Sequence, residues 1–267
     1  MNNLISSLFN KYTKSEMKIA NYVMNNDISY KSIVELAKAI KVGEATILRF
    51  CKKIGFSGFY DFKIAYIKSQ NSEEKSEELN LVDRVYGIYQ ETIEMAKSRV
   101  QLDTIKEATD LLLKSKDILI FGVGNSGITA RQVEAALQRR AYLARAIEDP
   151  HFQSIVAATL TSESLILAIS LSGYTRDIIE SISIAKKNGA KIIAVTNFSD
   201  STLGQLADIT VLTTSKENPL EGGALSAKIS QLFVLDLLFH QLDEINKAQV
   251  KEIKEKTAKA ISKKIVY

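Results

Sequence analysis

Six consecutive residues, SLSGYT at 170–175, place three Ser and Thr hydroxyls and a glycine between a predicted strand and a predicted helix. The apolar run at 165–169 is typical of a strand buried on both faces, and isoleucines recur at helical spacing after the turn. A helix N-terminus offers unpaired backbone N–H groups and the positive end of the helix dipole, and hydroxyls add further donors. The turn therefore predicts a binding site for the phosphate of a small ligand.

A second glycine-containing turn, GVGNSG at 122–127, follows another predicted strand. It matches the G-x-G-x-x-G pattern of dinucleotide-binding turns, and the acidic residues Glu148 and Asp149 follow about twenty residues later. Two features count against that alternative, a nucleotide-binding oxidoreductase. Asn125 and Ser126 would point polar side chains into a smaller site, and a phosphate at 170–175 would compete with a dinucleotide for space. Both turns are expected at the carboxyl ends of parallel strands, where such sheets bind ligands.

Three further polar residues have weaker cases. His151, in the run DPHFQ at 149–153, lies at a predicted loop-to-helix junction, where a surface or capping role is the alternative to a ligand contact. Glu221 and Lys228 lie near the start of the last long predicted helix; a Glu there suits the helix dipole, whereas Lys228 could pair with a phosphate. With two histidines and one cysteine, no cluster supports a metal site, and no cofactor is expected.

These turns belong to a region in which predicted strands and helices alternate. Strands are expected at 117–122, 142–147, 164–170, 191–196 and 208–213, with helices near 127–140, 151–160, 175–188 and 201–206 between them. Helices at 81–100 and 103–114 come before this region, and helices at 223–242 and 246–265 come after it. The alternation predicts an α/β fold, with a doubly wound parallel sheet covered by helices on both faces.

The first 70 residues carry only helical patterns. Helices at 32–40 and 44–53 are joined by a three-residue turn, which is the geometry of a helix-turn-helix, and Ser32 with Glu35 gives the signature of a capping box. The apolar residues expected to pack the pair together are Leu36, Ala37, Ile40, Val42 and Ile47. The N-terminal part is therefore predicted to be an all-α domain.

The second helix of this pair is expected to expose a polar row, namely Glu44, Thr46, Arg49, Lys52 and Lys53. Arg can hydrogen-bond guanine in the major groove, while lysines and hydroxyls near helix ends, that of Ser32 included, can hold phosphates. Residues 1–70 contain eleven Lys and Arg against five Asp and Glu, a balance of +6 in a chain of net charge +4. We interpret the row as a contact to double-stranded DNA; a plain helical bundle with a solvated basic face is the alternative.

The rest of the composition is that of an ordinary globular chain, and its 267 residues are enough for two domains. No apolar run is long enough to cross a bilayer and no secretory signal is recognisable, so no membrane partner is expected and the cytoplasm is the default compartment. The single cysteine, Cys51, is expected to be a packing residue. The polar stretch at 70–78 predicts domains at 1–70 and 81–267 with a linker at 71–80.

The run ATILRFCKKIGFSGFYDFK at 45–63 closely resembles the DNA-binding domain of the RpiR-type transcriptional regulators. The second part of the chain resembles the sugar isomerase (SIS) domain that is joined to it in that family. The resemblance implies a winged or extended helix-turn-helix bound to operator DNA, with a phosphosugar as effector. One position departs from the family, because Gly43 stands at the start of the recognition helix where Ser is common. No DNA contact is therefore assigned to Gly43.

The resemblance also implies roles for the two glycine-containing turns, which look like the SIS loops that hold a sugar and its phosphate. The sugar is then expected at Asn125 and Ser126, and the phosphate at Ser170, Ser172 and Thr175.

Three more roles come from the resemblance alone. The segment around His151 looks like a family segment near the sugar, and a Glu in the region of Glu221 can act as a base in SIS enzymes. In similar regulators that respond to N-acetylmannosamine 6-phosphate, a sugar of sialic acid catabolism, a Lys accompanies the Ser, Thr and His groups. Lys228 therefore makes that sugar the first candidate effector.

Two main hypotheses follow. In the first, the chain regulates sugar or amino-sugar catabolism and binds operator DNA as a homodimer or homotetramer, and a phosphosugar changes the spacing or orientation of its DNA-binding heads. In the second, it is a sugar-phosphate isomerase or lyase with an accessory helical domain, for which Glu221 and His151 are the available bases. The row of Arg49, Lys52 and Lys53 favours the regulator, since an isomerase has no use for it.

Overall fold

The computed structural model describes residues 1–70, 80–214 and 225–262. The chain forms two compact units, and the division between them falls between Val85 and Tyr86. The helices of 1–70 enclose one hydrophobic core, and the sheet region has cores of its own on its two faces. The domain limits predicted from the sequence stay predictions, and residues 71–79 of the predicted linker lie outside the described residues.

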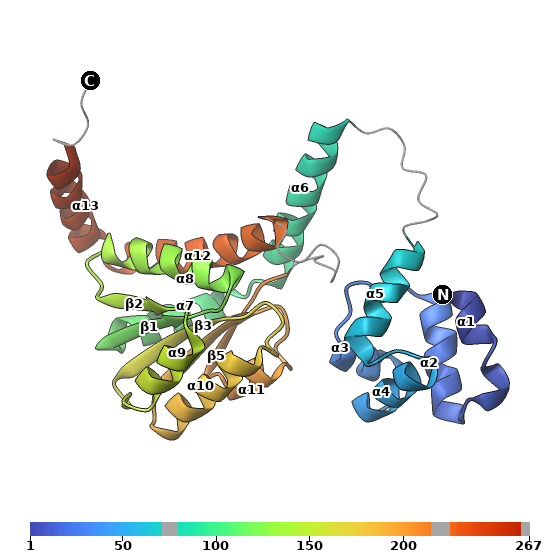
Figure 1. Ribbon diagram of the computed structural model, residues 1–267. Helices are drawn as coiled ribbons and strands as arrows, with labels where there is room; N and C mark the ends of the chain where they lie inside the picture. Colours follow the sequence, from blue (N-terminus) through green and yellow to red (C-terminus); the bar gives the residue numbers. More distant parts are fainter. Residues whose placement is uncertain (71–79, 215–224, 263–267) are drawn as a thin grey trace. The chain divides into compact units, whose positions relative to one another are not determined.

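The first unit consists of short helices (Figure 1), namely α1 Asn2–Ser6, the 3₁₀ helix Phe9–Lys11, α2 Lys14–Asn25, α3 Ile33–Ile40, α4 Glu44–Lys53 and α5 Phe59–Gln70. The 3₁₀ helix lies between α1 and α2. Residues 1–70 contain no strand, so the winged form of the helix-turn-helix is wrong and the purely helical form is the one present.

Residues of the predicted helix pair lie in the core of this unit. Leu36, Ala37, Ile40 and Ile47 are buried, and Val42 packs against them from a half-buried position, as the spacing predicts. The rings of Phe50 and Phe62 meet edge to face with centroids 6.1 Å apart, which joins α4 to α5. The α3–α4 pair is therefore held rigidly by apolar contacts on the side opposite its polar row.

Caps define where these helices begin. The Ser32 hydroxyl accepts a hydrogen bond from the Glu35 backbone N–H, and the Glu35 carboxylate accepts one from the Ser32 N–H, so the predicted capping box is confirmed. Lys41 ends α3 in the left-handed conformation, with φ of 59°. Gly43 then precedes α4 without any side-chain cap, because it has no side-chain oxygen to accept a hydrogen bond from the first backbone N–H groups of the helix.

The remaining helices and strands, whose ends lie within three residues of the predicted limits, are α6 Leu81–Arg99, α7 Leu102–Lys114, β1 Asp117–Phe121, α8 Asn125–Gln138, β2 Ala144–Ile147, α9 Pro150–Ala157, β3 Ser164–Ile169, α10 Arg176–Lys187, β4 Lys191–Thr196, α11 Thr202–Leu206, β5 Ile209–Leu212, α12 Leu225–Ile245 and α13 Lys247–Ser262. Residues 223–224 and 263–265 of the predicted helices lie outside the described residues. The five strands pair in parallel in the order β2-β1-β3-β4-β5. The predicted α/β fold with a parallel sheet is confirmed.

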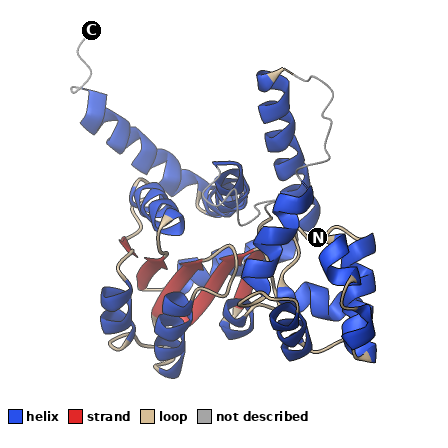
Figure 2. Cartoon of the chain, turned by 45° about the vertical axis from the view of Figure 1, so that its right-hand side comes forward, coloured by secondary structure: helices blue, strands red, loops and turns tan. Residues whose placement is uncertain are grey.

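Helices cover both faces of this sheet (Figure 2). On one face α7, α8 and α12 pack against the strands, and on the other face lie α9, α10 and α11. Successive strand residues alternate between the two cores, so that Leu167 faces the first and Ile166 the second. A sheet buried in this way explains why β3 consists of six buried residues in a row.

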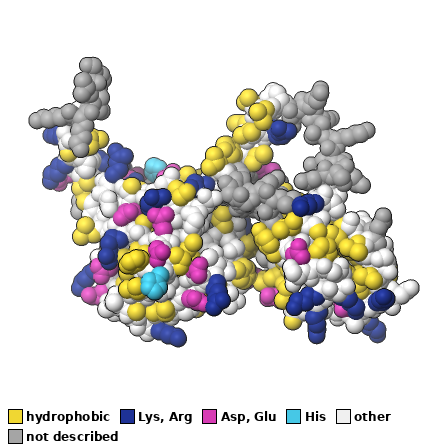
Figure 3. Space-filling view, in the orientation of Figure 1, with side chains coloured by type: hydrophobic (Ala, Val, Ile, Leu, Met, Phe, Trp, Pro, Cys, Tyr) yellow, Lys and Arg dark blue, Asp and Glu magenta, His cyan; other side chains and the backbone are white. Residues whose placement is uncertain are grey.

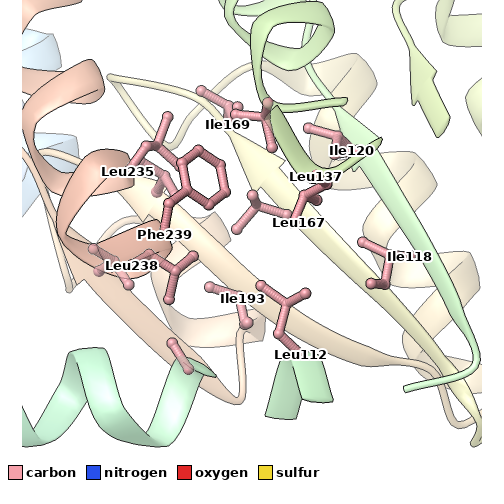
Figure 4. Packing of buried hydrophobic residues seen from close by; sticks show 14 of the residues in the cluster. Leu112, Ile118, Ile120, Leu137, Leu167, Ile169, Ile193, Leu235, Leu238 and Phe239 are labelled. Atoms are coloured by element: carbon pink, nitrogen blue, oxygen red, sulfur yellow. The ribbon is translucent and has the colours of Figure 1, made fainter. Parts of the chain in front are cut away.

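The long helix α12 closes the first face. Figure 4 shows Leu235, Leu238 and Phe239 of α12 gathered over strand residues that include Leu167 and Ile193. An ion pair strengthens the far end of this face, because the Arg140 guanidinium binds both carboxylate oxygens of Asp243 at 2.7 and 3.1 Å.

β1 and β3 are neighbours in the sheet, and the segments that follow them run to opposite faces. After β1 the chain passes into α8 on one face, and after β3 it passes into α10 on the other. The loops that leave β1 and β3 therefore diverge at the carboxyl edge of the sheet. Ligands of open parallel sheets bind at such a point.

Candidate functional site

The two predicted loops lie side by side at this edge of the sheet. Phe121, the last residue of β1, pairs with Ala168 near the end of β3, so GVGNSG and SLSGYT leave adjacent strands at the same edge of the sheet. The expectation that both turns lie at the carboxyl ends of parallel strands is confirmed. The carboxyl edge between the starts of α8 and α10 is therefore the candidate site in the sheet unit.

Hydroxyl groups of the SLSGYT loop contact one another and the loop backbone. The Oγ of Ser170 lies 3.0 Å from Oγ1 of Thr175 and accepts a hydrogen bond from the backbone N–H of Gly173 at 3.2 Å. The exposed Ser172 accepts one from the N–H of Tyr174 at 3.2 Å. Ser170 is buried, so its hydroxyl shapes the loop, while Ser172 presents its hydroxyl to solvent.

The N-terminus of α10 completes this loop. Thr175 occupies the N-cap position with extended backbone, but its side chain makes no capping hydrogen bond. The first backbone N–H groups of α10 consequently keep their hydrogen-bonding capacity for a ligand. An anion placed between these groups and the hydroxyl of Ser172 would receive charge-assisted hydrogen bonds as well as the favourable end of the helix dipole.

Gly173 allows the loop to approach its neighbour closely. It has a φ of +67°, and a Cβ at this position would lie 2.0 Å from Oγ of Ser201. Its carbonyl accepts a hydrogen bond from the N–H of Leu203 at 3.0 Å, so the loop rests directly on the start of α11. Sequence analysis missed this supporting role of Ser201, because the 27 residues between the two positions hide their proximity.

Glycines shape the GVGNSG turn in a similar manner. A Cβ on Gly122 would lie 2.5 Å from the backbone oxygen of Ser126, and Gly124 adopts a φ of +59° immediately before α8. The turn thereby places the exposed Asn125 and the half-buried Ser126 in the first turn of α8, at the carboxyl edge of the sheet.

Sequence analysis also missed Gln153, which is fully buried on α9. Its side-chain amide donates to the carbonyl of Gly122 at 3.2 Å and to that of Ile147 at 2.6 Å, and so joins the turn after β1 to the end of β2. This role of Gln153 can be recognised only once the fold is known, because the sequence does not show that its amide lies beside the ends of β1 and β2.

The acidic pair of the dinucleotide alternative has other partners. The carboxylate of Glu148 forms an ion pair with Arg131 at 2.9 Å, and Asp149 caps α9 by accepting a hydrogen bond from the N–H of Phe152. Both carboxylates therefore have partners within the protein and are not arranged to accept hydrogen bonds from a ribose. This removes the main support for a dinucleotide site.

The three remaining predicted ligand residues have different positions. His151 is exposed in the first turn of α9, which follows β2 at the same edge of the sheet. Lys228 is half-buried in the first turn of α12, and one turn later Gln231 hydrogen-bonds the hydroxyl of Thr129 on α8 at 3.0 Å. The start of α12 thus lies against the first turns of α8. Glu221 lies outside the described residues.

In the helical unit, α4 presents the predicted polar row to solvent. Glu44, Arg49 and Lys52 are exposed, and the Arg49 guanidinium lies 3.3 Å from the hydroxyl of Thr46. Lys and Arg side chains gather on the lower side of this unit in Figure 3, where Figure 1 draws α4. The Ser32 hydroxyl at the start of α3 is already engaged as a cap.

Two lysines of this unit are held by other residues. The ammonium of Lys53 lies 2.7 Å from the Glu16 carboxylate. Burial by itself raises the pKa of Glu16, but hydrogen bonds from Lys53 and Thr13 outweigh it and lower the pKa below its ordinary value. Burial also lowers the pKa of Lys63 to about 8, and its ammonium donates to the Lys31 carbonyl at 3.0 Å. Lys53 and Lys63 therefore support the fold of this unit.

Within residues 1–70, 80–214 and 225–262, no three His, Cys, Asp or Glu side chains are grouped as metal ligands. Over the same residues, no helix combines the length and the apolar character needed to cross a bilayer.

A helix-turn-helix unit followed by a doubly wound sheet with a hydroxyl-rich loop at its carboxyl edge is the architecture of a transcriptional regulator with a ligand-binding domain. The family described as "Helix-turn-helix domain, rpiR family" matches residues 1–73, and the SIS domain family matches residues 111–241. The chain belongs to the RpiR family of helix-turn-helix transcriptional regulators with an SIS domain.

Whole-chain relatives agree with this assignment. An HTH-type transcriptional regulator of Clostridium perfringens is 35% identical over 96% of this chain and 92% of its own length. The HTH-type transcriptional regulator RpiR of Escherichia coli is 30% identical over 92% of this chain and 86% of its own length. Among solved structures, the Vibrio vulnificus NanR protein complexed with ManNAc-6P has the same fold, with a TM-score of 0.88 at 24% identity over 100% of this chain and 99% of that one.

Proposed function

We propose that the SIS domain of this regulator binds a phosphosugar at the carboxyl edge between the β1 and β3 loops, and that the bound sugar changes the affinity of the helix-turn-helix for operator DNA. The observation that carries the proposal is the pairing of β1 with β3, which sets two ligand-type loops next to each other at the carboxyl edge. A regulator with an anion-binding loop in one unit and a basic helix in the other has the two sites that ligand control requires.

The phosphate is assigned to the SLSGYT loop. Ser172 and Thr175 would donate hydroxyl hydrogen bonds, the first N–H groups of α10 would donate from the backbone, and Ser170 would hold Thr175 in place through their 3.0 Å contact. The half-buried Lys228 supplies a cation for the same negative charge.

The sugar is assigned to the first turn of α8, with Asn125 and Ser126 as hydrogen-bonding groups and the exposed His151 at the rim. Glu221 stays in the proposed set on the family resemblance alone. N-acetylmannosamine 6-phosphate is our first candidate, because the NanR protein with the same fold is complexed with that compound.

DNA is assigned to the exposed side of α4. Arg49 is the base-reading candidate, Lys52 is the phosphate-contacting candidate, and Glu44 and Thr46 lie on the same helix. Lys53 and Ser32 are secondary candidates for DNA contacts, because Lys53 is paired with Glu16 and Ser32 caps α3.

We further propose that the ligand is sensed and not converted. Relatives that share nearly the whole chain are named as transcriptional regulators. Turnover of a phosphosugar remains the outcome that would favour the isomerase alternative.

A homodimer is the proposed unit on DNA, since operators with two half-sites are read by paired heads. The first half of α6 exposes apolar side chains at helical spacing, with Leu81 65% and Ile88 47% exposed, and these could pair with a second copy. Light scattering after size exclusion tests this, and a monomeric mass at micromolar concentration contradicts it.

The main experiment measures DNA binding by fluorescence anisotropy with duplexes tiled from both sides of the gene. Each duplex is titrated with the full chain alone and with a panel of amino-sugar and hexose phosphates that includes N-acetylmannosamine 6-phosphate. We expect one duplex to bind more tightly than the rest, and one phosphosugar to change its Kd by about tenfold or more. The unphosphorylated sugars serve as controls and should have no effect. Equal Kd values for all duplexes, or conversion of a phosphosugar, overturn the proposal.

A further inference from the structure

A short series of hydrogen bonds connects the phosphate loop to the end of α6. The carbonyl of Leu171, inside SLSGYT, accepts the backbone N–H of Asn197 at 2.9 Å and the hydroxyl of Thr196 at 3.2 Å. The carbonyl of Asn197 in turn accepts the guanidinium of Arg99 at 2.7 Å. Three segments far apart in the sequence thus meet at the residue that follows β4.

The middle of this series is held firmly. Asn197 is 6% exposed, and its side-chain oxygen accepts a hydrogen bond from the hydroxyl of Thr213 after β5. Hydrogen bonds to both the backbone and the side chain of Asn197 couple its movement to that of its neighbours. A displacement of Leu171 is therefore passed to the Asn197 carbonyl.

Arg99 lies where such a displacement matters. It is the last residue of α6, the helix that follows the segment 71–79 and so leads from the helix-turn-helix to the sheet along the chain. Of the nineteen residues of α6, all of which the structure describes, Thr92 and Ala96 are the buried ones. With so little apolar burial, the Arg99 hydrogen bond is a substantial part of what fixes this end of the helix.

The guanidinium also has room for a second position. Arg99 lines a cavity of about 250 Å³ together with the polar residues Gln101, Thr104, Ser199 and Thr210. Their oxygens can accept the hydrogen bonds that Arg99 would lose on leaving Asn197. Transmission between sites requires an element with two arrangements, and the cavity supplies the second one.

We infer that Arg99 is the residue through which occupation of the SLSGYT loop changes the position of α6, and hence the presentation of the DNA-binding unit. The inference rests on the proposed phosphosugar site and adds the route of its control. Arg99 is a positioning residue in this scheme, since it touches neither the sugar nor the DNA.

The test compares the full-length wild type with Arg99→Gln, and uses Lys97→Gln, an exposed basic residue in the same turn of α6, as the matched control. For each chain, anisotropy gives the Kd for the duplex without ligand and with a saturating phosphosugar, N-acetylmannosamine 6-phosphate first. Calorimetry gives the Kd for the sugar itself. We expect Arg99→Gln to bind the sugar within about threefold of wild type while its DNA response falls below about twofold. Lys97→Gln should keep the full response.

A full DNA response in Arg99→Gln overturns the inference, and so does a loss of sugar binding beyond about tenfold, which would make Arg99 part of the ligand site. If the wild type itself responds to no phosphosugar, the proposed function fails, whereas a full response in both the wild type and Arg99→Gln overturns this inference alone. Should Arg99→Gln not fold, hydrogen exchange in the wild type decides. Addition of the sugar must change exchange over residues 93–99, and unchanged exchange there contradicts the inference.

Discussion

The ammonium of Lys53 lies 2.7 Å from the carboxylate of Glu16, 37 residues earlier in the chain, and this pair joins the end of α4 to the start of α2. The Glu16 carboxylate also accepts the N–H of Thr13, so one buried carboxylate caps α2 and holds the recognition helix. Lys53 and Lys52 are adjacent in the sequence and both are exposed, yet the ammonium of Lys53 is held by Glu16 while Lys52 lies on the solvent side of α4.

Replacing Lys53 should therefore affect mainly stability, and replacing Lys52 should affect mainly DNA binding. Lys53→Met leaves the Glu16 carboxylate without its cation and should lower the free energy of unfolding by about 1–2 kcal/mol. Lys52→Met should leave stability within about 0.5 kcal/mol and should weaken DNA binding, with a salt dependence smaller by about one counterion. Urea unfolding and anisotropy at several salt concentrations measure both effects. Equal stability of the two variants would contradict the assignment.

Ser172 is the hydroxyl that most directly tests the phosphate site. Replacing it with Ala removes a hydrogen bond to a charged group, worth about 1.5–3 kcal/mol, so ligand affinity should fall about tenfold to a hundredfold or more. Ser183→Ala is the control, since the Ser183 hydroxyl binds the Ile179 carbonyl within α10. Calorimetric titration with the effector measures both, and an unchanged Kd for Ser172→Ala places the phosphate elsewhere.

Replacing Gly173 and Gly124 with alanine distinguishes the energetic cost of a positive φ from that of a steric clash. Both have positive φ, but a Cβ on Gly173 collides with Ser201, whereas a Cβ on Gly124 meets no atom within 4 Å. Gly124→Ala should cost about 1–2 kcal/mol from the left-handed conformation alone. Gly173→Ala should cost about 2–4 kcal/mol, since overpacking adds to the strain. Denaturant unfolding ranks the two, and the reverse order would show that the SLSGYT loop is not packed on α11 as described.

The cluster around Asp243 predicts how stability depends on pH. Burial by itself raises the pKa of Asp243, but hydrogen bonds from Arg140 and Lys254 outweigh it and lower the pKa below its ordinary range. A carboxyl whose pKa is lower in the folded state stabilises the fold above its unfolded pKa, about 3.9, and this contribution is lost as pH falls through the folded value.

Asp243→Asn should accordingly lower the free energy of unfolding by about 2–3 kcal/mol at neutral pH, and the difference from wild type should shrink below about pH 4. Asp236→Asn, at an exposed position of the same helix, serves as the control and should change stability by less than about 0.5 kcal/mol. Unfolding measured from pH 3 to 8 tests the sign. A difference that grows in acid would refute it.

Cys51 should be unreactive in the folded protein. Its side chain is fully buried in the core of the helical unit, and burial raises the pKa of the thiol to about 12. A thiol reagent such as DTNB is expected to label it only after denaturant is added, and mild oxidants should leave DNA binding unchanged. Rapid labelling of the native chain would show that this core opens readily.

Periodicity and turn chemistry were sufficient to predict the elements and both loops. Isoleucine spacing, the capping box at Ser32 and the glycines of the two turns each involve residues close together in the sequence, so they can be recognised without the fold. Alternation of strands and helices also predicted a parallel sheet with both turns at its carboxyl edge.

Contacts between distant segments could not be obtained in that way. The interpretation of Lys53 as a DNA contact depended on its exposed helical position, and the partner that engages it, Glu16, lies on another helix. The support of Gly173 by Ser201 and of Gly122 by Gln153 has no sequence signature, because any Ser or Gln has the same donors.

By itself, then, the sequence determined the two domain types, the helix-turn-helix and the hydroxyl-rich loop, because each depends on residues within about one turn or one strand of each other. Tertiary structure decided which of these residues are free to meet a partner and which are held. It also decided that Leu171, Asn197 and Arg99 lie in one hydrogen-bonded series. The physical reason is that burial and pairing depend on which segments the sheet order brings together, and this order is a property of the whole fold.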